Sequence, residues 1–157
     1  NYKDGKMDGL WTQWHENGQK QREVNFKDGK QDGLWQMWHK NGQKKLEGNF
    51  EDGNKEGFEV WWYENGKKKN EINYKNGKWD GLYVEWHENG QKEEEGNYKD
   101  GNKNDLWTEW YENGQKKTEG NYKNGKPVFF KGSSKWWDKN GNLTDIDGNI
   151  LEKAKAE

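Results

Sequence analysis

The 157-residue sequence contains no cysteine, one proline and two methionines. Without cysteine, disulfides and thiolate metal sites are excluded, and redox chemistry says nothing about the compartment. No apolar run approaches the roughly 20 residues of a transmembrane helix, so we expect no transmembrane segment. The sequence begins with Asn and shows no signal peptide, so we expect a fragment or processed product. Its localisation, in the cytoplasm or secreted to the cell surface, stays open.

Aliphatic residues are also scarce, which by itself would indicate disorder. Two observations oppose disorder. The net charge is only −2, with 27 basic and 29 acidic residues interleaved, and the chain contains 12 Trp and 7 Tyr. Each packed ring buries about 150–250 Å², which offsets part of the entropy lost on ordering. We therefore expect an ordered chain with a thin aromatic core.

A 24-residue unit is repeated along the chain, and the first copy reads NYKDGKMDGLWTQWHENGQKQREV. The copies open with asparagine at Asn1, Asn25, Asn49, Asn73, Asn97 and Asn121. A fixed period of this length predicts a repeat architecture, in which each unit packs against its neighbours. Such a fold presents a long surface, so we look for function there before looking for a pocket.

Each unit contains two tight-turn sequences, an Asp-Gly or Asn-Gly near its start, as at 4–5, and an Asn-Gly near its middle, as at 17–18. These residues supply the positive φ that hairpin turns require. A turn about every twelve residues, with no helical periodicity between turns, predicts an all-β, single-layer antiparallel meander of tandem hairpins. We expect about twelve strands.

The register of each hairpin follows from the length of its Asn-Gly loop. A three-residue loop, Glu16-Asn17-Gly18, would pair Leu10 with Val24 and Trp14 with Lys20 and collect the apolar side chains on one face. A two-residue loop would scatter them. We therefore predict the three-residue loop.

This register predicts one structural face built from residues that recur in every unit. It carries aromatics at Tyr2, Phe26, Phe50, Tyr74, Tyr98 and Tyr122, and apolar residues at Leu10, Leu34, Phe58, Leu82, Leu106 and Phe130. It also carries the structural tryptophans Trp14, Trp38, Trp62, Trp86, Trp110 and Trp137. Lysines opposite these tryptophans, beginning with Lys20, can lie across the indole rings.

The second face varies from unit to unit and is the predicted partner-binding face. Its aromatic positions are Trp11, Trp35, Trp61, Tyr83, Trp107, His15, His39, Tyr63, His87 and Tyr111. A row of glutamates beginning with Glu23 lies beside them. Exposed aromatics rimmed by charge are typical of binding surfaces. The alternative is that these rings only stabilise the sheet by cross-strand packing.

The repeat pattern weakens towards the C-terminus. We assign 1–126 to five full repeats plus the start of a sixth, and 127–157 to a degenerate sixth repeat and a C-terminal cap. Pro127 and the inserted Gly132-Ser133-Ser134 mark the change. The last eight residues, ILEKAKAE, are compatible with a short polar helix over the final edge strand.

The recurring core DG-x-W-x-x-W-H/Y-x-N-G-x-K, followed by G-N-Y-K-x-G-K, resembles the bacterial variant of the MORN repeat (membrane occupation and recognition nexus). The resemblance covers residues 1–126 in full and 127–142 weakly. It implies a single-layer β array that mediates interactions and has no catalytic motif. Many bacterial members are antitoxin-like or immunity-like, and others lie at the cell surface. A weaker resemblance connects the chain to aromatic choline-binding, cell-wall modules.

No catalytic, metal or cofactor site is predicted. His15, His39 and His87 lie in different units, too far apart to share an ion. The carboxylates recur with the repeat, so none forms a distinctive catalytic pair. The segment 138–152 lacks the residue order of a calcium loop. Nucleic-acid binding would require a basic excess, and membrane-surface binding a polybasic cluster or amphipathic helix; the sequence contains neither.

We therefore predict a non-catalytic scaffold for protein–protein interaction, with toxin neutralisation as its specific form. One alternative is a cell-surface module that binds glycan or cell wall through stacked aromatics. Another is a structural protein that self-associates end to end through its edge strands.

Overall fold

The computed structural model describes residues 2–128 and 133–154. The chain forms two compact units, Asn1–Trp79 (unit 1) and Asp80–Glu157 (unit 2). All regular structure in the described residues is β-strand, and no helix occurs among them. Phe130, a predicted member of the apolar row, lies outside the described residues. The assignment of 1–126 to repeats and 127–157 to a cap stays a prediction.

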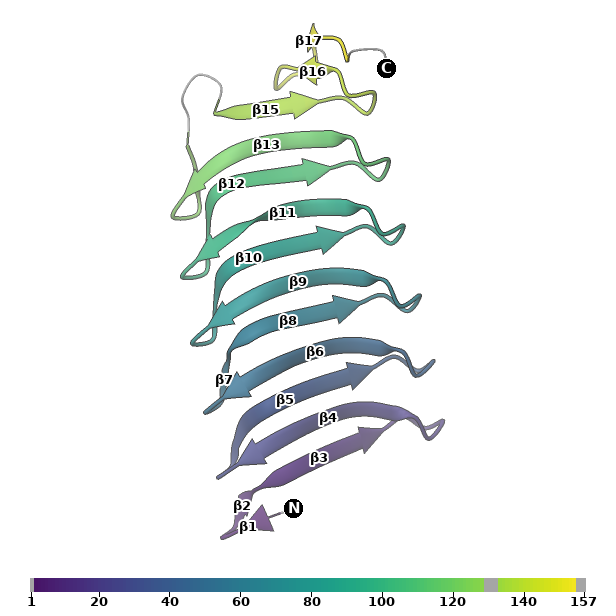
Figure 1. The fold of residues 1–157 in the computed structure, drawn as a ribbon, viewed down its shortest axis with the longest axis vertical. Helices are drawn as coiled ribbons and strands as arrows, with labels where there is room; N and C mark the ends of the chain where they lie inside the picture. The colour runs from purple at the N-terminus through teal and green to yellow at the C-terminus, as the bar shows by residue number, and fades with distance from the viewer. Residues whose placement is uncertain (1, 129–132, 155–157) are drawn as a thin grey trace. The chain divides into compact units, whose positions relative to one another are not determined.

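Unit 1 is an antiparallel sheet of consecutive hairpins (Figure 1). Its strands are β1 (Tyr2–Lys3), β2 (Lys6–Met7), β3 (Gly9–Trp14), β4 (Lys20–Lys27), β5 (Lys30–Trp38), β6 (Lys44–Glu51), β7 (Asn54–Lys55), β8 (Gly57–Trp62) and β9 (Lys68–Lys75). The sheet order is β3-β4-β5-β6-β8-β9, and the short β7 pairs with β6. Strands β1 and β2 pair with each other.

Unit 2 repeats this arrangement. Its strands are β10 (Lys78–Trp86, which begins in unit 1), β11 (Lys92–Lys99), β12 (Asn102–Trp110), β13 (Lys116–Lys123), β14 (Lys126–Pro127), β15 (Ser134–Trp137), β16 (Leu143–Thr144) and β17 (Ile150–Glu152). The sheet order is β10-β11-β12-β13-β15-β16-β17, and β14 pairs with β13. The suggestion of a C-terminal helix is wrong, because Ile150–Glu152 forms a strand paired with β16.

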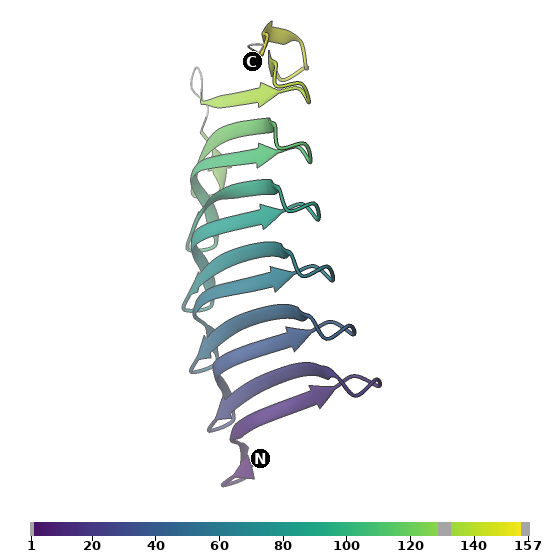
Figure 2. The same cartoon turned by 45° about the vertical axis from the view of Figure 1, so that its right-hand side comes forward.

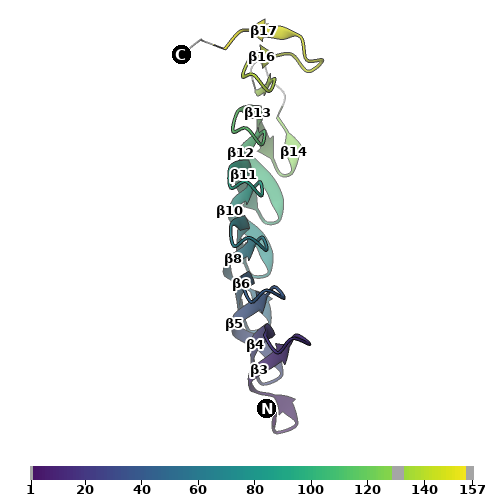
Figure 3. The same cartoon turned by 90° about the vertical axis from the view of Figure 1, so that its right-hand side faces the viewer.

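The predicted fold class is confirmed: the chain is all-β, and each unit is a single antiparallel layer of tandem hairpins. Figure 3, in which the strands from β3 to β13 are seen nearly end-on, shows no second layer of described residues in either unit. A sheet normally buries a face against another element. Here the side chains of neighbouring strands must cover one another within the layer.

The Asp-Gly turns form as the sequence predicts. Asp4 and Gly5 both have positive φ, 49° and 76°, and Lys3 pairs with Lys6 across the two-residue loop. Two successive positive φ values define the turn whose twist matches a hairpin. In each unit these turns lie at one side of the sheet and the Asn-Gly loops at the other (Figure 2).

The Asn-Gly loop also has the predicted length. In the first repeat the His15 amide donates to the Gln19 carbonyl at 2.8 Å, and the Gly18 amide donates to the His15 carbonyl at 2.9 Å. These bonds enclose a three-residue loop with Gly18 at positive φ. Trp14 pairs with Lys20, as predicted.

The predicted pairing of Leu10 with Val24 is wrong. Leu10 lies opposite Asn25, and Val24 lies opposite Trp11. The cause is a β-bulge: Gln13 pairs with Arg22 and Trp14 with Lys20, which leaves Gln21 without a partner. The extra residue shifts the rest of the second strand by one position. The same shift recurs at β5–β6, β8–β9, β10–β11 and β12–β13.

The bulge changes which rows share a face, since side chains alternate along a strand. The open face carries Leu10, Trp14, Lys20, Glu23 and their equivalents in later repeats. The packed face carries Trp11, Gln13, Val24, Phe26 and their equivalents. Relative to our prediction, the aromatic row containing Phe26 and the glutamate row containing Glu23 have exchanged faces.

The packed face holds most of the thin core. In unit 1 the side chains of Val24, Leu46, Ile72 and Tyr74 are buried there, and in unit 2 that of Trp107. Gly96 allows the indole of Trp107 to lie directly on the backbone of β11, because a Cβ atom at this position would overlap the ring.

We predict that Gly96→Ala destabilises the protein by about 1–3 kcal/mol, the usual cost of overpacking a core. The measurement is the urea dependence of tryptophan fluorescence. Gly48→Ala is the matched control, because its nearest neighbour would be the side-chain Cγ of Glu59 at 3.3 Å, which can shift. Equal losses in the two variants would contradict the tight indole–backbone contact.

Candidate interaction surfaces

Trp107, a predicted partner-binding residue, lies in the core of unit 2 and is only 3% exposed. Its ring centroid is 5.0 Å from that of Tyr98 and 5.8 Å from that of Tyr83. Lys103 Nζ lies 3.9 Å from the ring centroid, and the indole N–H donates to the Asn97 carbonyl at 3.1 Å. These contacts give Trp107 a packing role.

Two further residues of this predicted row are packed in the same way. In unit 1, the Trp35 ring lies 5.5 Å from Phe50 and 5.0 Å from Lys55 Nζ, measured to ring centroids. In unit 2, the Tyr83 hydroxyl donates to Glu85 Oε2 at 2.6 Å. Burial and this bond to a carboxylate raise the pKa of Tyr83 well above its usual value.

The remaining members of the row differ from one another. Trp11, in strand β3 of unit 1, is 36% exposed. At the equivalent position of the third repeat, Glu59 is buried and pairs with Lys55 at 2.5 Å. The indole N–H of Trp61 donates to the other oxygen of Glu59 at 2.9 Å. Lys55 Nζ also lies 4.7 Å from the ring centroid of Tyr74. The buried carboxylate of Glu59 therefore has a cationic partner, and that partner also contacts an aromatic ring.

The His/Tyr row connects neighbouring repeats. His15 Nε2 lies 3.0 Å from the Trp38 carbonyl, and His39 Nε2 lies 2.9 Å from the Trp62 carbonyl. Because a carbonyl oxygen only accepts hydrogen bonds, the Nε2 atom of each of these histidines must carry the proton. In unit 2, His87 bonds in the same way to Trp110, and the Tyr111 hydroxyl donates to the Trp137 carbonyl. Tyr63 lies near Lys69, whose Nζ is 5.8 Å from its ring centroid.

The predicted structural tryptophans also contact the neighbouring repeat. Lys20 Nζ lies 5.5 Å from the ring centroid of Trp38, and it pairs with Glu23 at 2.8 Å. The same lysine–tryptophan contact recurs between Lys44 and Trp62, Lys92 and Trp110, and Lys116 and Trp137. Each lysine therefore pairs with the tryptophan of the same hairpin, as Lys20 does with Trp14, and places its ammonium over the tryptophan ring of the next hairpin, here Trp38.

Sequence reasoning missed one exposed surface. The apolar row predicted to be structural is on the open face and is exposed to between 37% and 52%. We call it the apolar ladder: Leu10, Leu34 and Phe58 in unit 1, and Leu82 and Leu106 in unit 2. Each member lies opposite the asparagine that opens the next repeat. Recurrence of an apolar residue predicted burial, but no described element covers these side chains.

The described residues contain no group of three His, Asp or Glu side chains placed to hold a metal ion. They also contain no helix with the length and apolar character needed to cross a bilayer. Whether the predicted aromatic and His/Tyr residues contact a partner stays a prediction.

We predict that Trp107→Ala lowers the free energy of unfolding by about 3–5 kcal/mol, because it removes a buried aromatic ring. Its neighbour Leu106→Ala should change this free energy by less than about 1 kcal/mol, because Leu106 is half exposed. Urea denaturation of both variants measures the difference. A larger loss from Leu106→Ala would show that the two faces have been assigned wrongly.

Alkaline pH should destabilise unit 2. Burial, followed by the nearby charges of Glu94 and Glu85, raises the pKa of Tyr98 from 10.0 to about 12. An unfolded chain therefore loses the Tyr98 proton first, and stability conferred by the neutral hydroxyl falls as the pH rises from 10 to 12. In urea titrations across this range, Tyr98→Phe should lose less stability than the unchanged protein. An identical loss would rule out Tyr98 as a source.

The segments of the chain that match a known family coincide with its hairpin repeats. The family described as MORN repeat variant matches five segments of the chain, residues 7–28, 31–52, 55–76, 79–100 and 106–124. A search of curated proteins found no match. Repeats of this family generally mediate interactions with proteins or membranes, and the family is in general non-enzymatic. Because the five segments cover more than half of the sequence, the chain belongs to the MORN repeat variant family.

Proposed function

We propose that this protein is a non-catalytic scaffold that binds another protein through its open face. The apolar ladder is the observation that carries the proposal. Its five side chains stand at the same position of five successive repeats and remain 37–52% exposed. Leaving them in water gains nothing for the sheet, whereas covering them would release about 25 cal/mol per Å² of apolar surface.

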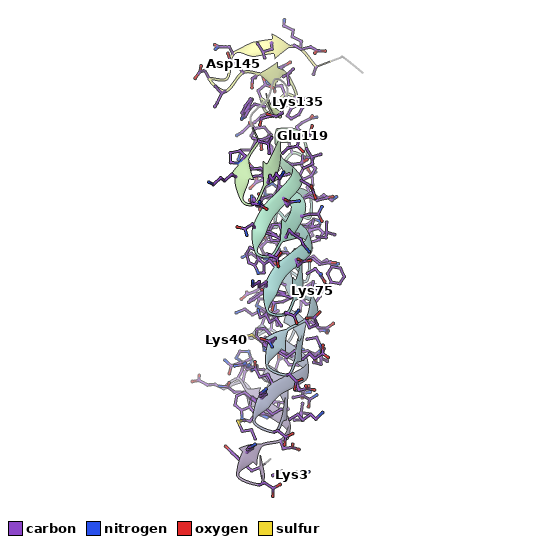
Figure 4. The ribbon with its side chains drawn as sticks, turned by 90° about the vertical axis from the view of Figure 1, so that its left-hand side faces the viewer. Lys3, Lys40, Lys75, Glu119, Lys135 and Asp145 are labelled. Carbon is purple, nitrogen blue, oxygen red and sulfur yellow. The ribbon has the colours of Figure 1, made fainter. Side chains whose placement is uncertain are left out.

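The charges beside the ladder favour a protein over a bare membrane surface. In five successive repeats a lysine and a glutamate of the open face form an ion pair, such as Lys68–Glu71 at 2.6 Å and Lys116–Glu119 at 2.5 Å. Figure 4 labels Glu119, a member of this row. An anionic membrane attracts an excess of basic residues, which these balanced pairs do not supply. An apolar centre with a mixed polar rim is typical of protein interfaces.

Toxin neutralisation is the specific form of this function that we propose. An immunity protein acts by covering the surface of its partner, so it requires contact area and no chemistry. The packed aromatics argue against the glycan alternative, because Trp35 and Trp107 already use their faces within the sheet. The Trp11 and His/Tyr rows stay a second prediction for the contact surface, tested beside the ladder.

Site-specific photo-crosslinking in the native source tests the proposal. A benzoyl-phenylalanine replaces Leu34, Phe58 or Leu106 on the open face, or Glu64, an exposed residue of an Asn-Gly loop, as the control. We expect one protein to crosslink to the ladder positions and not to position 64. With that protein purified, Phe58→Ser should weaken binding about tenfold, as loss of an apolar anchor does, with little change in stability.

Crosslinks at position 64 without any at the ladder would contradict the open face as the binding surface. Unchanged affinity of Phe58→Ser, combined with weaker binding by Trp11→Ala, would assign contact to the aromatic row instead.

A further inference from the structure

A groove of about 560 Å³ lies in unit 2, at the Asn-Gly loops of its first two hairpins. His87, Trp110 and Tyr111 supply aromatic rings to its lining. Five carboxylates also line it: Glu85, Glu93, Glu94, Glu109 and Glu112. Only two lysines, Lys117 and Lys139, oppose them within the lining. The groove is therefore strongly acidic in a protein whose net charge is close to zero.

Two of the five carboxylates have a lysine partner. Glu109 Oε2 lies 3.1 Å from Lys117 Nζ, and Glu94 pairs with Lys103. The other three do not pair with lysine among the described residues. Glu85 accepts from a tyrosine hydroxyl, Glu93 Oε2 lies 3.4 Å from His87 Nδ1, and Glu112 is exposed at the rim.

Unit 1 has a groove at the corresponding place, with a volume of about 450 Å³. Its lining contains His15, which is equivalent to His87, but the charges differ. Gln13, Gln21 and Lys40 stand where unit 2 has Glu85, Glu93 and Glu112, each 72 residues further along. Figure 4 labels Lys40. The hairpin loops therefore form the hollow with either set of residues, so the fold does not require the negative charge of unit 2.

We propose that the acidic groove of unit 2 binds a basic segment of a partner protein, with an arginine or lysine side chain inserted between the carboxylates and the rings. A guanidinium is held well by such a set, because it donates to carboxylates and stacks on aromatic faces. The described carboxylates are too spread out for three of them to hold a metal ion, which suits an extended cationic chain. This inference rests on the proposed protein-binding function and names the chemistry of its partner.

Calorimetric titration with a capped peptide of alternating Arg and Gly tests the groove. We expect the full chain to bind one peptide, more weakly as salt screens the charges. The variant Glu85→Gln/Glu93→Gln/Glu112→Gln keeps the side-chain shapes and should bind about tenfold or more weakly. The variant Glu51→Gln/Glu64→Gln/Glu152→Gln removes the same charge from exposed positions elsewhere and should bind unchanged.

A gain of function completes the test. Gln13→Glu/Gln21→Glu/Lys40→Glu gives the groove of unit 1 the three carboxylates that were removed from unit 2, and it should create a second binding site for the peptide. Equal weakening by both glutamine variants, or equal binding of a peptide with Glu in place of Arg, would overturn the proposal. Such a failure would leave the crosslinks at the apolar ladder unaffected, because the ladder lies on the strands of the open face and the groove at the loops.

Discussion

Bonding between neighbouring hairpins, within the plane of the sheet, is the constraint on which the structure depends. No second layer of described residues covers either unit, so each repeat must obtain its burial from the next one. Lys20 lies over the ring of Trp38, and His15 bonds to the carbonyl of the same residue. The loop residue Asn17 donates to the Lys40 carbonyl at 2.8 Å. These contacts can form in every repeat only if their residues recur, so the interaction itself imposes the 24-residue period.

The same constraint separates positions that must repeat from positions that are free to vary. Residues that contact a neighbouring hairpin, such as Trp38 and Lys44, are repeated, whereas several groove-lining positions, such as that of Gln13, vary in charge. Gln13 and Glu85 stand at equivalent positions of two repeats and have side chains of nearly the same shape. A repeat scaffold of this kind can therefore change the charge of one groove without altering the contacts between hairpins.

The turns could be predicted from the sequence because Asn-Gly and Asp-Gly act locally, and the loop of three residues around Asn17 follows from them. The bulge at Gln21 could not be predicted, because an ordinary polar residue is the one left without a cross-strand partner there. Side-chain sizes across the strands offered one clue. Trp35, Tyr83 and Trp107 each lie opposite a glycine, whereas the smaller Glu59 lies opposite Ile72. The first repeat departs from this pairing of large with small residues, because Trp11 lies opposite Val24, and the pattern is therefore hard to recognise in the sequence.

Recurrence therefore has two physical origins in this chain, and only one of them is packing. Trp38 recurs because two residues of the preceding hairpin contact it: Lys20 lies over its ring, and His15 bonds to its carbonyl. Leu34, four residues earlier, recurs equally well but is 46% exposed. In a protein with a layered core, both residues would be expected to be buried. In a single layer, a recurrent apolar residue that the sheet does not cover is the strongest pointer to a surface that another molecule covers.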